Sequence, residues 1–349
     1  MKYIYSCPSC KSKKIFALKK YNFKNPKIKT VEKHLDNYSK IRLWVLFNKL
    51  IQKEKSAIHF KINMCQKCGF IFLNPRFTQE DLILKYKVLK NLGTEENTTN
   101  KYSLKYYQDK RAKRVYNLIK YNSSFEEKND LKILDYGGAT GYNLKYFLEK
   151  FKTFIIDYYE RDFIDPKIEY LGKDLEELKN NNNQKFDIIL LLHTLEHISK
   201  PKKFLNNLIT LLKEDGIIYI EVPLGCYMEW NFLTEPLTHI NFFSEQSLYS
   251  LCKLCGLNIK YINTSYQWVV TKNKWNLNII CTKSDKLKSV KSEDVLLTHF
   301  QLLKLKYFII DLFSFNFSLK SYIKSLYNKF LKIISYILTL ERKVYKKVF

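Results

Sequence analysis

The stretch from residue 131 to residue 150 constrains the fold more than any other part of the chain. Its first four residues are mainly apolar and too few for a helix, so they predict a buried strand. Gly137, Gly138 and Gly141 then predict a sharp turn that lets a ligand approach the backbone. Apolar residues recur at helical spacing over Tyr142–Lys150. Strand, glycine-rich turn and helix in this order are typical of the ligand-cradling start of a doubly wound α/β domain.

The turn also carries a recognisable family pattern. Asp135 ends the predicted strand, and the turn lacks the Lys-Ser/Thr pair of a P-loop. Asp135-x-Gly137-x-Ala139-x-Gly141 resembles D-x-G-x-G-x-G, the first motif of class I S-adenosylmethionine-dependent methyltransferases, with Ala139 in place of the middle glycine. The resemblance implies that Asp135 and the backbone of Gly137, Gly138, Ala139 and Gly141 hold the methionine portion of S-adenosylmethionine.

The resemblance also implies two acidic cofactor contacts further along. In the family, a carboxylate at the end of the second strand holds the ribose hydroxyls, and a carboxylate suits a cis-diol because each oxygen accepts one hydrogen bond. Glu160 closes the β-rich run Phe154–Tyr159, and Asp157 within that run is the competing candidate; we favour Glu160. Asp174 resembles the family residue that contacts the adenine amino group, and a solvated loop acid is the alternative interpretation.

Strand and helix patterns alternate through this region. Buried-strand runs are predicted at Phe186–Leu192 and Ile217–Val222, with an amphipathic helix at Pro201–Leu212 between them. Later strands are predicted at Leu257–Ile262 and Asn276–Thr282. We therefore expect an α/β fold with a Rossmann-like, doubly wound, mostly parallel sheet.

The segment His193-Thr194-Leu195-Glu196-His197 follows the strand at Phe186–Leu192, where open α/β sheets place ligands. It resembles the fourth-strand region of the methyltransferase family, and His193 is also a candidate for cofactor contact. Three interpretations stay open. His197 or His193 acts as a general base; or His193, Glu196 and His197 bind a divalent metal, as similar elements do in some ubiquinone-pathway and small-RNA methyltransferases; or Glu196 and His197 are structural.

His239 is a second candidate base, because the segment around it resembles a late family segment beside the substrate. A loop histidine with no catalytic role is the alternative. Ser244 nearby is the predicted N-cap of a helix over Glu245–Cys255, and Ser247 three residues later is neither Glu nor Gln, so no full capping box is expected.

Two C-x2-C pairs, Cys7/Cys10 and Cys65/Cys68, lie near the start of the chain. Each pair fits a knuckle turn that presents two thiolates, and a structural zinc ion takes four. The four cysteines therefore predict a structural Zn²⁺ site, with unrelated reduced thiols as the alternative. Cys252 and Cys255 share the spacing but lie in a predicted helix, and we interpret them as core thiols.

The second cysteine pair leads into Gly69 and then Asn74-Pro75-Arg76. This resembles the C-x-x-C-G-hydrophobic-N-P-R segment before the methyltransferase domain of one bacterial subgroup. Many members of that subgroup act on sugars or other intermediates of surface-polysaccharide and natural-product pathways. We expect residues 1–100 to form a zinc-knuckle module with a helical insertion and a connector, residues 101–285 the cofactor domain, and residues 286–349 a basic amphipathic helical tail.

Charge bears on partners and location. Sixty Lys and Arg against 34 Asp and Glu give a net charge of +26, which favours anionic partners. The abundance of Lys, Asn, Ile and Tyr is equally expected of an AT-rich genome, so charge alone identifies no partner. No secretion signal or membrane span is evident, and the protein is expected in the cytoplasm. The C-terminal helix could lie on the inner face of the membrane or pack on protein.

The sequence thus predicts a zinc-knuckle-bearing class I methyltransferase that uses S-adenosylmethionine and structural Zn²⁺. The expected acceptor is a small, anionic or lipid-linked molecule, with a sugar intermediate favoured. Nothing in the chain resembles a covalent nucleophile, and methyl transfer requires none. The alternatives are an RNA methyltransferase, consistent with the charge and the zinc module but lacking a tight Arg-rich aromatic patch, and a non-catalytic scaffold that retains the fold.

Overall fold

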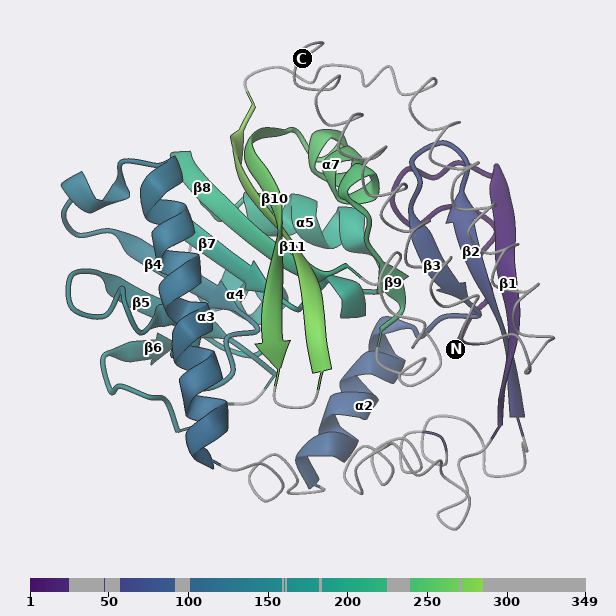
Figure 1. The fold of residues 1–349 in the computed structure, drawn as a ribbon, viewed down its shortest axis with the longest axis horizontal. Helices are drawn as coiled ribbons and strands as arrows, with labels where there is room; N and C mark the ends of the chain where they lie inside the picture. Colours follow the sequence, from purple (N-terminus) through teal and green to yellow (C-terminus); the bar gives the residue numbers. More distant parts are fainter. Residues whose placement is uncertain are drawn as a thin grey trace, which may run out of the picture. The chain divides into compact units, whose positions relative to one another are not determined.

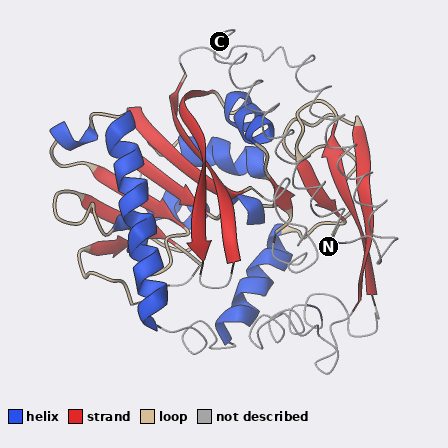
Figure 2. Cartoon of the chain, viewed as in Figure 1, coloured by secondary structure: helices blue, strands red, loops and turns tan. Residues whose placement is uncertain are grey.

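The computed structural model describes residues 1–24, 47, 57–91, 101–158, 160, 162–181, 184–224, 239–269 and 272–284. All of them lie in one compact unit, Met1–Leu297. The strands of this unit form two sheets, one of seven strands and one of four (Figures 1 and 2).

The seven-stranded sheet contains the glycine-rich turn. Its strands, in spatial order, are β10 (Leu257–Val269), β11 (Lys272–Lys283), β8 (Leu212–Pro223), β7 (Phe186–Leu192), β4 (Lys132–Tyr136), β5 (Lys152–Ile156) and β6 (Ile168–Tyr170). The pairs from β8 to β6 are parallel, whereas β11 runs antiparallel to both β8 and β10. The predicted mostly parallel α/β sheet is confirmed.

The order of the strands places a switch point between β4 and β7. The chain leaves β4 for β5 and β6 on one side, then returns to β7 and β8 on the other. Connections from β4 and β7 therefore diverge at the carboxyl edge of the sheet, and open α/β sheets bind ligands at such a point.

Alternating strand residues feed a hydrophobic core on each face of this sheet, because successive side chains point to opposite faces. Helices α4 (Leu175–Asn181), α5 (Pro201–Ile209) and α7 (Glu245–Leu254) contribute to one core. Helix α3 (Lys101–Asn122), the short helix η1 (Phe125–Glu127) and the segment after the glycine turn contribute to the other. Figure 1 shows α3 in front of the sheet, with α4 and α5 behind it.

The four-stranded sheet is antiparallel and brings together distant parts of the chain. It comprises β1 (Ile15–Lys24), β2 (Ala57–Cys65), β3 (Ile71–Asn74) and β9 (Asn241–Phe242). Helix α2 (Gln79–Asn91) follows β3. Thr78 and Asp81 cap α2: the backbone N–H of Thr78 donates to Asp81 Oδ2 at 2.8 Å, and that of Asp81 donates to Thr78 Oγ1 at 3.3 Å.

Two local predictions were wrong. The segment Tyr142–Lys150 is not an α-helix but a short 3₁₀ helix, η2 (Tyr142–Leu144), followed by turns. The backbone bonds of this segment mostly span three residues, as from Leu144 N to Gly141 O at 2.9 Å. Ser244 caps α7 as expected, but a reciprocal capping box does form, because the Ser247 hydroxyl accepts from Ser244 N at 2.9 Å.

Other predictions fall outside the described residues. These include the C-terminal tail and, apart from Phe47, the helical insertion between the cysteine pairs. Within the part of the chain that the structure describes, no helix is both long and apolar enough to cross a membrane.

Candidate active site

The glycine-rich turn follows β4 directly and is held by backbone constraints. Gly137 and Gly141 have φ of +78° and +86°, and a Cβ on Gly138 would lie 2.8 Å from Asp135 Cγ. Ala139 has φ of +49°, so an L-residue occupies the left-handed conformation that glycine adopts at little cost. The turn therefore presents bare backbone, as a ligand that must approach closely requires.

The turn packs against the histidine-bearing loop after β7. A Cβ added to Gly137 would lie 2.6 Å from Thr194 Oγ1. The Thr194 hydroxyl lies within hydrogen-bonding distance of the backbone oxygens of Tyr136, at 3.3 Å, and Leu192, at 3.1 Å. The two predicted half-sites, cofactor turn and histidine loop, are thus in direct contact at the switch point.

Asp135 is fully buried beneath the turn, and its Oδ2 accepts from Asn143 Nδ2 at 2.9 Å. Burial raises the pKa of Asp135 to about 7, against the opposing effects of Asn143 and of the Arg111 charge. Asp135 Oδ1 and Arg111 Nη2 are both buried, and neither has a hydrogen-bond partner among the described residues. A partly buried guanidinium group and a buried carboxylate, each with unused hydrogen-bonding capacity, thus lie near the turn.

Of the two acids considered for the ribose, Asp157 lies beside the turn. It follows β5 immediately, and its Oδ2 accepts from the backbone N–H of Ala139 at 3.0 Å. Glu160 is exposed three residues further along. Asp174 caps α4, since its Oδ1 accepts from the backbone N–H groups of Glu176 and Glu177, each at 3.0 Å.

The four predicted catalytic residues, His193, Glu196, His197 and His239, lie close together in space in the region that follows β7. Glu196 is 2% exposed and lies in the short helix η3 (Leu195–His197). Its Oε1 lies 3.5 Å from His193 Nδ1 and 3.8 Å from His197 Nε2. The rings of His197 and His239 have centroids 4.8 Å apart. Ligand atoms of Glu196, His197 and His239 all lie within 4.8 Å of one another.

Electrostatics keep the Glu196 carboxylate ionised. Burial alone would raise its pKa, but His193 and the charges on His197 and His239 outweigh burial and lower the pKa to about 2. One carboxylate among imidazoles can support a base on a histidine, and it is also a donor set that divalent transition metals accept. The geometry therefore keeps the general-base interpretation. It changes the ligand set of the metal interpretation, because the group whose ligand atoms lie together contains His239 in place of His193.

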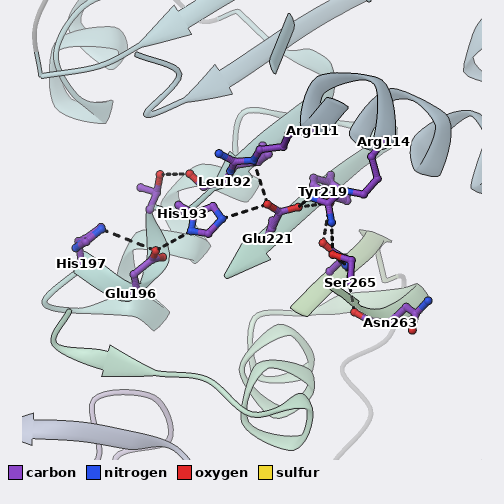
Figure 3. Close-up of polar contacts among 12 residues, drawn as sticks. Arg111, Arg114, Leu192, His193, Glu196, His197, Tyr219, Glu221, Asn263 and Ser265 are labelled. Atoms are coloured by element: carbon purple, nitrogen blue, oxygen red, sulfur yellow. Dashed lines mark hydrogen bonds and ion pairs between the residues drawn. The ribbon is translucent and has the colours of Figure 1, made fainter. Parts of the chain in front are cut away.

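A buried ion network extends from this cluster to α3 (Figure 3). Glu221, fully buried near the end of β8, lies 3.2 Å from His193 Nε2. The same carboxylate pairs with Arg111 Nε at 3.1 Å and with Arg114 Nη2 at 2.7 Å. Burial would raise the pKa of Glu221, but the charge of Arg111, then His193 and Arg114, lowers it. His193 thus lies between two buried carboxylates, with φ of +50°.

The predicted cysteine cluster also assembles. Sulfur atoms of Cys7 and Cys68 are 3.6 Å apart, those of Cys10 and Cys65 are 3.4 Å apart, and all four lie within 4.8 Å of one another. Tetrahedral Zn²⁺ with Zn–S bonds of about 2.3 Å requires sulfurs about 3.8 Å apart, so the donor set fits. Contact with Cys10 lowers the pKa of Cys65 and raises that of Cys68.

The two cysteine turns are matched in their backbone bonds. Lys11 N donates to Cys7 O at 3.0 Å, and Gly69 N donates to Cys65 O at the same distance. Lys11 and Gly69 end these turns with φ of 65° and 66°. Both pairs therefore form the same knuckle, whereas the buried Cys252 lies in α7 as expected of a core thiol.

Sequence reasoning missed Arg111 and Glu221. Glu221 carried a usable signal, because a charged residue inside the apolar run of β8 needs a partner. Arg111 carried none, since it is one of many basic residues on α3 and its neighbours come from the sheet.

Comparison with known proteins agrees with this geometry. Residues 107–262 match the family model described as a methyltransferase domain. This segment contains the glycine turn, the histidine loop and every strand from β4 to β9. Residues 107–262 thus resemble a methyltransferase domain in sequence.

Individual relatives match over a limited part of the chain. The ubiquinone biosynthesis O-methyltransferase of Rickettsia bellii (strain OSU 85-389) is 30% identical over 118 residues, covering 30% of this chain and 47% of that protein. The protein of the same name from Rickettsia canadensis (strain McKiel) is 27% identical over 124 residues, covering 32% and 51%. The chain spans about half the length of the curated relatives it matches.

Among solved structures, one similar chain is the Burkholderia thailandensis 1,6-didemethyltoxoflavin-N1-methyltransferase with bound 1,6-didemethyltoxoflavin and S-adenosylhomocysteine. It is 14% identical with a TM-score of 0.46, and the match covers 62% of this chain and 95% of that one. The N-methyltransferase NodS from Bradyrhizobium japonicum WM9 is 14% identical with a TM-score of 0.38, and the match covers 51% of this chain and 87% of that one.

Proposed function

We propose that this protein transfers a methyl group from S-adenosylmethionine to a hydroxyl group of a small-molecule acceptor. The observation that carries the proposal is the contact between Gly137 and Thr194, which joins the cofactor turn to the histidine cluster. In-line transfer requires that donor and acceptor be aligned closely. The similarity to ubiquinone biosynthesis O-methyltransferases supports oxygen as the atom that is methylated.

The residues around the turn fit the cofactor. Arg111 and Asp135 present a cation and a carboxylate, which complement the zwitterionic amino-acid end of S-adenosylmethionine. Asp157 offers its carboxylate to the ribose hydroxyls, and its position favours it over Glu160. Asp174, which caps α4, is proposed at the adenine end. When bound, the cofactor supplies an electrophilic methyl group on a sulfonium.

The histidine cluster serves the acceptor. His197 or His239 removes the hydroxyl proton, and Glu196 stabilises the resulting imidazolium. His193 is held by Glu221 and Glu196, so we assign it an orienting role rather than the role of base. The competing proposal is a divalent cation on Glu196, His197 and His239, which would activate the hydroxyl instead.

For the acceptor we propose a sugar or lipid-linked intermediate of surface-polysaccharide or natural-product biosynthesis. The support is the C-x-x-C-G and Asn74-Pro75-Arg76 segment, which resembles that subgroup, and the net charge of +26, which suits an anionic acceptor. The four cysteines are proposed to bind structural Zn²⁺.

The test is to incubate the purified protein with methyl-labelled S-adenosylmethionine and a fractionated lysate. Label in nucleotide-sugars or lipid-linked glycans supports the proposal, and label in RNA would replace it with an RNA methyltransferase. If the protein binds the cofactor but labels no fraction, the acceptor is missing from the lysate. If it neither binds the cofactor nor labels a fraction, the result favours a non-catalytic scaffold.

The cofactor assignment has its own matched pair of variants. Asp157→Asn should weaken S-adenosylhomocysteine binding measured by calorimetry, and Glu160→Gln should leave it unchanged. The opposite result would return the ribose contact to Glu160.

A further inference from the structure

The strand β9 makes the N-terminal sheet a part of the candidate active site. Phe242 pairs with Ile71 and Asn241 with Phe72, so β9 extends the sheet that begins at the cysteine cluster. Leu73 N also donates to Ile240 O at 3.1 Å. His239 directly precedes Ile240, so the pairing with β3 fixes the chain immediately after the histidine.

The same strand holds the short helix that carries Glu196 and His197. Ile240 N donates to Glu196 O at 3.0 Å. The side-chain amide of the buried Asn241 donates to Leu195 O at 2.9 Å and to Ile198 O at 2.8 Å. A helix end leaves carbonyl groups without intrahelical partners. Leu195 O also accepts from Ile198 N at 3.3 Å within the turn, whereas Ile240 and Asn241 supply donors to Glu196 O and Ile198 O.

Arg76 completes the attachment from the N-terminal side. It follows β3 by two residues and is 3% exposed. Its Nη2 donates to Ile198 O at 3.3 Å, to Ser199 O at 2.8 Å and to Asn241 Oδ1 at 2.8 Å. One buried cation thus joins β3, β9 and the loop after η3, and its charge suits the carbonyl end of a helical turn.

We propose that Arg76 is a positioning residue, which together with Asn241 fixes Glu196 and His197 opposite His239. The N-terminal module then supports the side chains of the acceptor site and is not a separate binding unit. This inference rests on the proposed function for its catalytic consequence, but not for its structural one. No atom of Arg76 needs to touch cofactor or acceptor.

The test compares Arg76→Met, which removes the three contacts, with Arg76→Lys, which keeps a buried cation that can replace some of them. The first readout is the affinity for S-adenosylhomocysteine by calorimetry. The second is the rate at which diethyl pyrocarbonate modifies His197 and His239, followed by mass spectrometry. The third is the kcat and KM of methyl transfer with whichever lysate fraction the wild type labels.

We expect Arg76→Met to retain S-adenosylhomocysteine affinity, to modify both histidines several-fold faster, and to lose roughly ten- to a hundredfold in kcat with unchanged KM for the cofactor. Arg76→Lys should recover part of each change. Thr78→Ala is the matched control, because it removes the cap of α2 in the same segment without touching η3. It should change none of the three readouts.

Unchanged histidine modification in a folded Arg76→Met protein would overturn the proposal, as would a parallel loss of cofactor affinity. Should that variant fail to fold, Asn241→Leu removes the two amide donors at similar volume and is expected to give the same pattern. If the wild type labels no fraction and binds no S-adenosylhomocysteine, the proposed function fails, while the modification readout still decides the role of Arg76.

Discussion

Gly137 and Thr194 lie so close that a Cβ added to the glycine would be 2.6 Å from Thr194 Oγ1. Gly137→Ala should therefore push the turn and the histidine loop apart, and its φ of +78° adds strain. We expect loss of S-adenosylhomocysteine binding and a drop of about 2 kcal/mol in the free energy of unfolding. Adding Thr194→Ala should recover part of the stability; no recovery would show that the contact is not the cause.

At Ala139 the expected effect is the reverse, because replacing this residue by glycine should stabilise the protein. Its φ of +49° costs an L-residue about 1 kcal/mol, and glycine removes that cost. Ala139→Gly should therefore raise the unfolding free energy by somewhat less than this, because glycine also makes the unfolded chain more flexible. Urea denaturation measures the difference in unfolding free energy between the variant and the wild type. A less stable variant would contradict the proposed backbone strain at Ala139.

Asp135 should make the cofactor-free protein less stable as the pH rises. Its pKa of about 7 exceeds the unfolded value of about 3.9, so its contribution is fully present below about pH 4 and is lost towards pH 7. Across that window the wild type should lose about 4 kcal/mol relative to Asp135→Asn, which stays neutral. Denaturation curves of both proteins at several pH values test this, and parallel pH profiles would refute it.

Glu221 should be essential to stability because it neutralises a buried network. Glu221→Gln leaves Arg111, Arg114 and His193 without their carboxylate and should cost about 3 kcal/mol. Its lowered pKa means that this stabilisation is present above the unfolded pKa and is lost as the pH falls below it. Glu214→Gln, which breaks the exposed pair with Lys283, is the control and should change stability little.

The cysteine cluster predicts one zinc ion per chain. Cys65→Ser should abolish the zinc content measured by atomic emission and lower the melting temperature. Cys252→Ser alters an equally buried thiol in α7 and should leave the zinc content unchanged. If the purified wild type contains no zinc and stays folded in the presence of a chelator, the cysteine cluster is not a structural zinc site.

Much of the fold could be predicted because its signals are local. The strand β4 with its glycine turn and the buried strand β7 follow from short runs of residue type. The cysteine pairs follow from the chemistry of their spacing. The helix expected after Gly141 did not form, because the same apolar spacing also suits a series of tight turns whose side chains pack against α3.

The rest depends on contacts between distant residues. Asp157 rather than Glu160 adjoins the turn because β5 ends at Ile156, a boundary that the residue pattern did not define. Arg111 reaches Glu221 across 110 residues, and no neighbour in the sequence marks it. The two-residue strand β9 is too short to produce any alternation.

The position of β9 also sets an order of events during synthesis. Arg76 and Asn241 are 165 residues apart, so a ribosome delivers all four cysteines well before the last strand of their sheet. The early strands must wait with an open edge beside β3 until the strands up to β8 have been made, and such an edge is prone to pair with other chains. If the cysteines bind zinc as proposed, metal capture by the nascent chain would hold that unfinished sheet together, and the yield of folded protein would then depend on zinc supply during translation.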